Sequence, residues 1–334
     1  MNMEEIITLD YGSGGKKTSR LIEKMIVPAL NNPALAALGD GAVLDGFERL
    51  AFSTDSFVVD PIFFPGGDIG KLSVCGTVND LAMCGAEPKY LSCSFIIEEG
   101  MALSDLEKIV ESIKSQCEKC NVQVVTGDTK VVEKGRGDKI YINTAGIGFV
   151  KYPGLDAKNI SEGDLVIVSG TVGDHGTAVM MARSGMMQGG LKSDCAALGG
   201  LCEKILATGA KVRVLRDPTR GGLATTLNEF VENTELSIEL EEKLIPVKAQ
   251  VQAACDMLGL DPMYCANEGK LICIVAREDG EKVLAAMQQT EEGRDAAIIG
   301  SVSKAFPGKL VMQTAFGGRR VLQKLTGAQL PRIC

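Results

Sequence analysis

Two kinds of apolar spacing alternate along this chain, and this alternation limits the possible folds more than any other feature. Residues 104–120 place apolar side chains on one helical face, and Ser104 with Glu107 forms a capping box at the start. Residues 122–125 and 140–150 have the composition and spacing of strands. Strands and helices that alternate in this way predict a mixed α/β (α+β) fold.

The pattern divides the chain into two units. Between residues 151 and 163 the periodicity lapses into Pro, Gly, Asp and Asn, which is typical of a domain boundary. At 334 residues the chain is long enough for two hydrophobic cores. We therefore expect domains at residues 1–152 and 153–325 and a mobile tail at residues 326–334. In the second unit we expect strands at 165–168, 271–275, near Ile298 and near Leu310, and helices at 177–183, 223–234, 247–258 and 281–289.

The composition argues against several classes of function. A net charge of −8 disfavours nucleic-acid and anionic-membrane partners, since both attract basic surfaces. Gly, Asp or Lys interrupts every long apolar stretch, and the acidic start lacks the features of a signal peptide, so we expect a cytoplasmic location. Eleven cysteines, an odd number, point to free thiols, and a single histidine rules out a His-rich metal site within one chain.

Five aspartates lie where strands are expected to meet turns or helices. One of them follows the predicted strand 122–125, which we expect to end at Gly127-Asp128. Proteins of the α/β class place ligand-binding groups at such positions. Carboxylates that converge on one site repel each other unless cations lie between them, and Mg²⁺ bound to nucleotide phosphates is the usual reason for such a cluster. Each aspartate alone could equally form a turn or cap a helix. The five are Asp40, Asp55, Asp80, Asp128 and Asp217.

A glycine-rich loop and two other polar residues extend this hypothesis. Residues 12–18, with Gly14 and Lys16, precede a helical pattern, and their amides could hold phosphate at the start of that helix. The spacing matches neither a P-loop nor a Rossmann fingerprint, so a merely flexible segment is the alternative. His175 lies at an expected helix start, where a neutral ring or a structural cap would be consistent with the sequence. Glu268 precedes an expected strand and is a candidate acid or base, unless it is simply solvated.

In this order, the motifs resemble those of the AIR synthetase superfamily of ATP-using enzymes over essentially the whole chain. The resemblance implies that acidic positions of the Gly-Asp, Thr-Asp, Asn-Asp and Gly-Asp-Thr segments hold ATP with Mg²⁺. It also implies a homodimer formed through a sheet of the N-terminal domain, with ATP near the interface. Relatives often have Gly-Asp-Asp-Ala where this sequence has Gly39-Asp40-Gly41-Ala42, so one carboxylate is missing. The expected cofactor contacts are Asp40, Asp55, Asn79, Asp80, Asp128, Thr129 and Lys130 with Gly14 and Lys16 of the glycine loop, and the expected metal ligands are Asp40, Asp55, Asp80, Asp128 and Asp217.

The C-terminus, Pro331-Arg332-Ile333-Cys334, is similar to that of the HypE family of hydrogenase maturation proteins within this superfamily. The resemblance implies that the carbamoyltransferase HypF loads a carbamoyl group onto Cys334 and that ATP drives its dehydration to a thiocyanate. It implies further that the cyanide passes to a HypC–HypD complex for a nickel–iron centre. Cys334 would then be a tethered substrate. Lys130 and Lys134 become candidate phosphate contacts, with Glu268 the first and His175 the second candidate base.

Two other functions remain compatible with the sequence. A small-molecule kinase or synthetase of the same superfamily would not need the tail for phosphoryl transfer. A non-catalytic, ATP-gated carrier would hold a thiol adduct without changing it. The other ten cysteines are expected to fill the core, since Cys117 lies on the apolar face of residues 104–120 and Cys117-x-x-Cys120 has no second pair to complete a zinc site.

Overall fold

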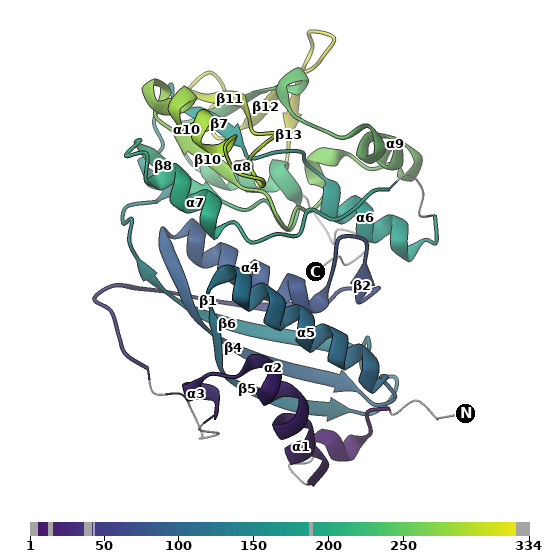
Figure 1. Ribbon diagram of the computed structural model, residues 1–334. Coiled ribbons are helices and arrows are strands. Elements are labelled where there is room, and N and C mark those ends of the chain that lie inside the picture. Colours follow the sequence, from purple (N-terminus) through teal and green to yellow (C-terminus); the bar gives the residue numbers. More distant parts are fainter. Residues whose placement is uncertain (1–5, 13–15, 37–41, 43, 187–189, 325–334) are drawn as a thin grey trace.

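The computed structural model describes residues 6–12, 16–36, 42, 44–186 and 190–324. These residues form two units, each built around a β-sheet, with helices of both units lying between the two sheets (Figure 1). The mixed α/β class and the two-unit organisation are as predicted, while the exact boundary at residues 152/153 stays a prediction. No helix within the described ranges is long and apolar enough to cross a membrane.

The N-terminal unit contains a four-stranded sheet in the order β1-β6-β4-β5. Only β4 and β5 pair in parallel, and the other neighbours are antiparallel. Short helical segments and a two-stranded ribbon complete the unit. The strands are β1 (Leu50–Phe57), β2 (Phe63–Phe64), β3 (Gly67–Asp68), β4 (Ala86–Glu98), β5 (Gln123–Val132) and β6 (Ile140–Val150), and the helices are η1 (Leu9–Gly12), α1 (Lys16–Leu21), η2 (Ile22–Ile26), α2 (Val27–Leu30), α3 (Pro33–Ala36), α4 (Ile69–Met83) and α5 (Leu103–Cys120).

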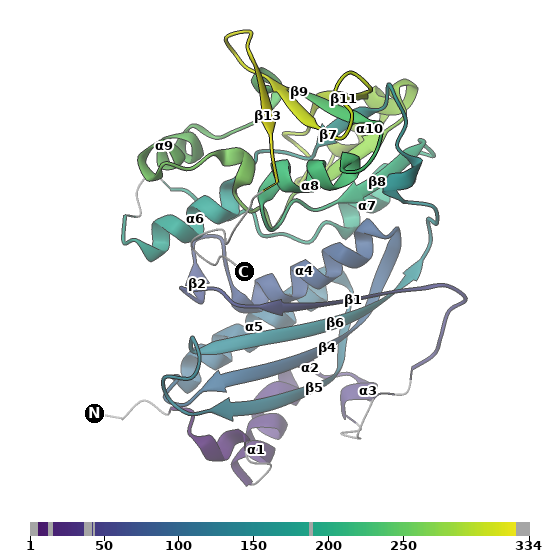
Figure 2. The same cartoon turned by 180° about the vertical axis from the view of Figure 1, so that it is seen from behind.

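The two faces of this sheet differ. Helices α4 and α5 cover one face, and Figure 2 shows the strands in front of these helices when the molecule is seen from behind. Alternation along β1 sends Ser53, Asp55 and Phe57 toward the helices and leaves the residues between them exposed on the other face. We call this second surface the open face of the N-terminal sheet.

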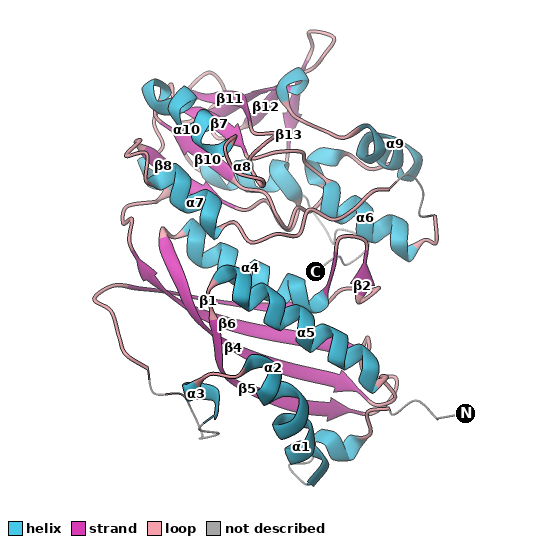
Figure 3. Cartoon of the chain, in the orientation of Figure 1, coloured by secondary structure: helices cyan, strands magenta, loops and turns pink. Residues whose placement is uncertain are grey.

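The C-terminal unit contains a seven-stranded sheet in the order β13-β12-β9-β11-β7-β10-β8, with helices packed around it (Figure 3). The sheet is antiparallel except for the β12–β9 pair. Its strands are β7 (Leu165–Val168), β8 (Val212–Arg216), β9 (Ser237–Glu241), β10 (Ile272–Val275), β11 (Ala297–Ser303), β12 (Leu310–Gln313) and β13 (Arg319–Leu322). Its helices are α6 (Asp174–Arg183), α7 (Gly199–Leu206), α8 (Gly222–Val231), α9 (Ala249–Leu258) and α10 (Gly280–Met287), with short 3-10 turns η3 (Ala157–Asn159), η4 (Glu242–Leu244), η5 (Pro262–Tyr264) and η6 (Arg277–Asp279).

Every strand and helix predicted for the second unit is present within a few residues of its expected position, and β7 matches residue for residue. Residues 140–150 also form the predicted strand, β6. The ten cysteines of the described residues are free thiols, and eight of them, including Cys117, are buried as predicted. The prediction that all ten fill the core is wrong for two, since Cys84 is exposed and Cys120 is half-buried.

Two predictions about the first unit are wrong. The strand expected at residues 122–125 does not end at Gly127-Asp128 but continues as β5 to Val132. A glycine is required at position 127, because β4 passes so close that a β-carbon there would strike the carbonyl oxygen of Cys93. The capping box is also absent, since α5 begins at Leu103 with extended Ala102 as its N-cap residue and without a side-chain cap bond.

The sequence pattern showed no sign of α4, the helix on which the two units meet. Thirteen of its fifteen residues are buried, because the sheet and α5 lie on one side and the C-terminal unit on the other. A helix that is buried all round has no apolar stripe, so its sequence lacks the helical period. Asp68 begins the helix by accepting hydrogen bonds from the backbone N–H groups of Gly70 and Lys71, at 2.7 and 3.0 Å.

Candidate functional site

Asp55 and Asp80 lie close together because α4 is fixed onto the N-terminal sheet. The hydroxyls of Thr77 on α4 and Thr144 on β6 share a hydrogen bond of 2.6 Å, and Thr144 is paired with Asp55 of β1. Ser53, two residues before Asp55 on the same face, donates to Asp80 Oδ2 at 2.6 Å. Burial and then the charge of Asp80 raise the pKa of Asp55, as expected for neighbouring carboxylates.

The second unit adds two buried carboxyl groups at the same place. Asp217, which follows β8, is 8% exposed, and burial followed by the charge of Asp80 raises its pKa to about 7. Glu268 is 4% exposed, and burial raises its pKa well above the ordinary value, with further contributions from the charges of Asp217 and Asp55. We call this group of four acidic residues the carboxylate cluster: Asp55, Asp80, Asp217 and Glu268. It lies between the two units and combines residues from both.

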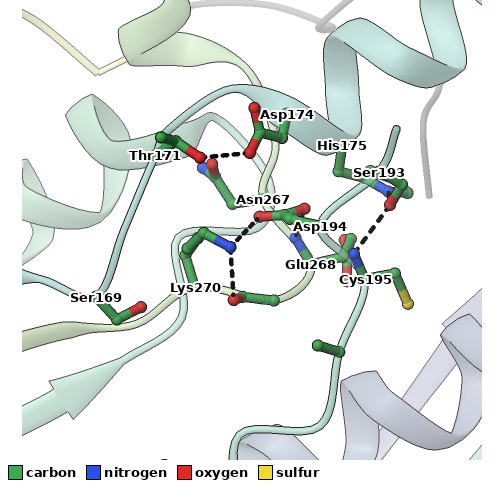
Figure 4. A network of polar contacts seen from close by, with 12 residues as sticks. Ser169, Thr171, Asp174, His175, Ser193, Asp194, Cys195, Asn267, Glu268 and Lys270 are labelled. Carbon is green, nitrogen blue, oxygen red and sulfur yellow. Dashed lines mark hydrogen bonds and ion pairs between the residues drawn. The ribbon is translucent and has the colours of Figure 1, made fainter. Parts of the chain in front are cut away.

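A network of buried polar contacts holds Glu268 in place (Figure 4). The backbone N–H of Glu268 donates to Asp194 Oδ1 at 3.1 Å, and the other oxygen of Asp194 faces Lys270 Nζ at 3.6 Å. Asn267, the preceding residue, accepts a hydrogen bond of 2.7 Å from the backbone N–H of Gly173. These contacts fix the backbone at Glu268, the point from which its buried side chain extends.

His175 lies at the start of α6, as predicted, and is fully buried. Its Nδ1 is 2.8 Å from the hydroxyl of Ser193, and its ring meets Phe64 edge-on at 5.4 Å between centroids. The backbone N–H of Ser193 donates to Pro65 O at 2.8 Å, so the histidine belongs to a contact between the two units. Its predicted role as an alternative base stays a prediction.

Asp128 is not part of the carboxylate cluster. Pairing across the sheet aligns Asp128 with Ser94, Asn143 and Ser56, so it lies on the edge strand opposite to that of Asp55. Three strand spacings of about 4.8 Å separate these edges by about 14 Å. Residues in one register row share a face, so Asp128 is on the open face with Ser56, whereas Asp55 faces α4.

The Gly-Asp-Thr-Lys segment instead meets the predicted glycine loop. A cavity of about 300 Å³ lies between β5 and the N-terminal helices, and its lining includes Gly12, Thr18, Asp128, Thr129 and Lys130. Lys130 Nζ lies 3.3 Å from Asp128 Oδ2 at the exposed rim. Gly12 and Thr18 are the first and last residues of the predicted glycine-rich loop. The two ends of that loop and the Gly-Asp-Thr-Lys segment, which were predicted independently from the sequence, therefore line the same cavity. We call this the glycine-loop cavity.

The remaining predicted residues are placed as follows. Asn79 is buried, and its side chain donates to Ala196 O at 3.0 Å and accepts from Leu198 N–H at 2.7 Å, which ties α4 to the second unit. Lys134 lies in the exposed turn after β5. Hydrogen bonds from the backbone N–H groups of Gly135 and Lys139, and then the charge of Lys134, lower the pKa of Glu98. Lys16 is the first residue of α1. Asp40, Gly14 and Cys334 lie outside the described residues.

The carboxylate cluster suits Mg²⁺, although the metal set predicted from the sequence is not assembled in one chain. Among the described residues, no group of three or more Asp, Glu, His or Cys side chains is arranged to hold a metal. Mg²⁺ normally takes only one or two carboxylates and fills its shell with phosphate oxygens and water. The adjacent Asp55 and Asp80, whose mutual repulsion a cation would relieve, fit that pattern.

Sequence reasoning missed Arg220 and the buried network behind Glu268. The Nη2 atom of Arg220 lies 3.9 Å from Asp55 Oδ1. Arg220 therefore joins the second unit to this carboxylate of the first. Its only sequence signal was its place in Arg-Asp-Pro-Thr-Arg-Gly-Gly beside Asp217. Asp194 and Ser193 had no signal, because the segment that contains them has no regular period.

Comparisons with known proteins assign the chain to a family. The AIR synthase related protein family matches residues 38–150 with its N-terminal domain and residues 161–313 with its C-terminal domain. Carbamoyl dehydratase HypE of Cupriavidus necator is 48% identical over 332 residues, which cover 98% of this chain and 95% of that protein. The chain belongs to the HypE family. HypE of Escherichia coli, also named carbamoyl dehydratase, is 44% identical over 98% of this chain and 99% of its own length.

Solved HypE structures agree with the fold described above. HypE in complex with ATP is 48% identical and superposes with a TM-score of 0.94, covering 98% of this chain and 99% of that chain. A HypE–HypF complex contains a chain that is 46% identical, with a TM-score of 0.80 over 91% of this chain and 99% of that chain. The two AIR synthase-type domains predicted from the sequence are therefore those of HypE proteins.

Proposed function

We propose that this protein uses ATP to dehydrate an S-carbamoyl group on Cys334 to an S-cyanate (thiocyanate). Membership of the HypE family, whose curated members are named carbamoyl dehydratase, carries the proposal. The relative solved in complex with ATP supports the nucleotide. A cluster of acidic groups from both units supplies a place where a magnesium-bound triphosphate and the tail could meet.

The reaction must remove an oxygen atom that leaves poorly as hydroxide. The carbamoyl oxygen attacks the γ-phosphorus of ATP, the bond to the β–γ bridging oxygen breaks with its electron pair on ADP, and one amide proton is lost. The C–O bond then breaks with its electron pair on inorganic phosphate, the second nitrogen-bound proton is removed, and the C≡N bond forms. The protein has to align the two groups, neutralise charge and accept protons.

The described residues divide these tasks between them. Asp55 and Asp80 would hold Mg²⁺, which supplies charge neutralisation at the phosphate oxygens. Glu268 is our candidate base, because burial raises the pKa of its carboxyl group and so makes the ionised form a stronger proton acceptor. Lys130, at the rim of the glycine-loop cavity, is the candidate phosphate contact that the structure places beside Asp128. Lys134 remains a second candidate.

We further propose a homodimer in which one active site uses residues from both chains. The open face of the N-terminal sheet exposes apolar side chains, including Phe52 at 72%, Phe47 at 52% and Leu50 at 49%, and such a surface is typical of an interface. In one chain Asp128 and Asp55 lie on opposite edges and opposite faces. A second copy facing this sheet offers a way to bring the two groups into one site.

Subunit mixing tests the shared site. Asp80→Asn and Asp128→Asn should each inactivate a homodimer. If one site takes Asp80 from one chain and Asp128 from the other, each mixed dimer contains one intact site, and random mixing restores about a quarter of the wild-type activity. Mixtures that stay inactive while the two variants demonstrably exchange subunits would show that both residues act within one chain.

HypF and a HypC–HypD complex are the proposed partners. The solved HypE–HypF complex supports HypF as the source of the carbamoyl group. Delivery of the cyanide to HypC–HypD and then to a nickel–iron hydrogenase centre is the downstream step that we propose. The carbamoyl group is carried by the protein itself, so each partner has to reach the same terminal thiol.

Intact-protein mass spectrometry tests the proposed activity. Carbamoylated protein should lose the mass of one water when Mg²⁺ and ATP are added. Cys334→Ala should carry no adduct, and Asp80→Asn should carry the adduct without losing water. A wild-type adduct that stays unchanged with ATP would favour the carrier function, and phosphoryl transfer to a free substrate by a tail-deleted chain would favour a small-molecule kinase or synthetase.

A further inference from the structure

Arg220 reaches from the C-terminal unit over the carboxylate cluster. It lies in the loop between β8 and α8, three residues after Asp217, and its Nη2 is 3.9 Å from Oδ1 of Asp55 on β1. The side chain of Arg220 is 79% exposed, whereas that of Asp55 is 30% exposed. The guanidinium group therefore lies at the solvent side of the cluster.

The loop that positions Arg220 is held rigidly. Gly221 and Gly222 have φ angles of 75° and 61°, which non-glycine residues rarely adopt. A β-carbon on Gly222 would also lie 2.6 Å from Cys265 O, so close packing fixes this turn. Asn267 donates to Pro218 O through its side chain at 3.0 Å and through its backbone N–H at 3.2 Å. Because Asn267 precedes Glu268, one anchor positions both the arginine loop and the candidate base.

Stability does not account for this placement of Arg220. An exposed ion pair at 3.9 Å contributes little, typically between zero and about 1 kcal/mol. Arg216, at the end of β8, differs because it lies 3.5 Å from Glu229 within its own unit. Arg220 thus has a well-fixed backbone and a side chain whose one described ion pair is long. Such a side chain can turn from Asp55 to another anion with little loss of free energy.

We propose that Arg220 binds the phosphoryl group as it moves from ATP to the carbamoyl oxygen, and then the phosphate that leaves. This inference rests on the function proposed above. The planar guanidinium group matches two phosphoryl oxygens at once through parallel N–H donors. While the P–O bond to ADP breaks and that to the carbamoyl oxygen forms, negative charge spreads over these oxygens. Asp55 would hold the guanidinium near that position before ATP enters.

Single-turnover dehydration of the carbamoylated protein, followed by intact mass at saturating Mg²⁺ and ATP, tests this role. Removing a donor that acts on the transition state costs about 100- to 1,000-fold, so Arg220→Ala should slow water loss by that factor. Arg220→Lys should be intermediate, because it keeps the charge but loses the bidentate fork. Added guanidinium should partly restore Arg220→Ala. The matched control is Arg294→Ala, an exposed arginine in the turn before β11, which should react at the wild-type rate.

Two further measurements separate this role from a structural one. The affinity of Arg220→Ala for a non-hydrolysable ATP analogue with Mg²⁺ should stay within about threefold of wild type, because an interaction made mainly in the transition state leaves ground-state binding unchanged. Its melting temperature should also be unchanged. Lower thermal stability together with a defect that guanidinium does not restore would overturn the proposal in favour of an interdomain contact.

The two proposals fail in distinguishable ways. If wild type and Arg294→Ala both lose water while Arg220→Ala does so at the wild-type rate, the arginine proposal is wrong and the dehydratase proposal stands. If wild type itself never loses water with Mg²⁺ and ATP, the dehydratase proposal is wrong, and the role of Arg220 in that reaction is wrong with it.

Discussion

Replacing Asp217 by asparagine should stabilise the metal-free protein at alkaline pH. Burial is the main reason that the pKa of Asp217 rises from 3.8 to about 7, and the charge of Asp80 is the next. The folded protein therefore keeps a proton on Asp217 at pH values where the unfolded chain has lost it. As pH rises from about 4 to about 7, this difference progressively lowers the free energy of unfolding. Above about pH 7 the free energy of unfolding stays lower by the full cost of ionising the buried carboxyl group.

The pKa values set the size of the effect. One pKa unit corresponds to about 1.4 kcal/mol, so a rise from 3.8 to about 7 limits the penalty to at most about 4 kcal/mol. The asparagine side chain of the Asp217→Asn variant carries no charge at any pH and escapes this penalty. The gain in Asp217→Asn should therefore be larger at pH 8 than at pH 5, by up to about 3 kcal/mol, because most of the ionisation lies between these values.

Urea unfolding at pH 5 and pH 8 in the presence of a chelator measures this gain. Asp164→Asn is the matched control, since Asp164 is also buried but lies 3.0 Å from Arg213 Nε and accepts from the backbone N–H of Ser161. Breaking that pair should destabilise the protein by about 1–3 kcal/mol. Equal gains for Asp217→Asn at both pH values, or no gain at pH 8, would refute the electrostatic reasoning. Added Mg²⁺ should stabilise wild type more than the variant.

The remaining predictions concern the backbone and the open face. Asn79→Ala should destabilise the protein by about 1–3 kcal/mol in urea unfolding, because the buried backbone N–H of Leu198 and the half-buried carbonyl of Ala196 lose their partner. Gly222→Ala should cost more than about 1 kcal/mol because of its positive φ, whereas Gly199→Ala, with open space around it, should be neutral or stabilising. Phe52→Ser should shift the proposed homodimer toward monomer in light scattering, without loss of the monomer fold in circular dichroism.

Local patterns of apolar residues were enough to predict eight of the twelve helices and strands of the C-terminal unit, including the almost fully buried strands β7 and β10. They failed for α4, because burial on nearly all sides removes the polar stripe that marks a helix. The error at β5 has a similar origin. A glycine usually interrupts a strand, but here the close approach of β4 to Gly127 requires one, and only the packed sheet reveals that approach.

The candidate site was predictable as a set of residue types but not as an arrangement. Carboxylates beside glycines pointed to metal and phosphate chemistry, and the structure gathers Asp55, Asp80 and Asp217 with Glu268. The separation of Asp128 follows from strand register, which no single segment encodes. Asn79 stays a predicted cofactor contact from the resemblance, although both ends of its amide group already bind the backbone of the second unit.

The central claim is that phosphoryl transfer to the carbamoyl oxygen makes dehydration possible. The most direct measurement follows that oxygen, using protein carbamoylated on Cys334 with a heavy-oxygen label and a single turnover with Mg²⁺ and unlabelled ATP. Our account predicts that the label appears in inorganic phosphate as the protein loses the mass of one labelled carbamoyl oxygen and two protons. Unlabelled phosphate together with labelled water would contradict it.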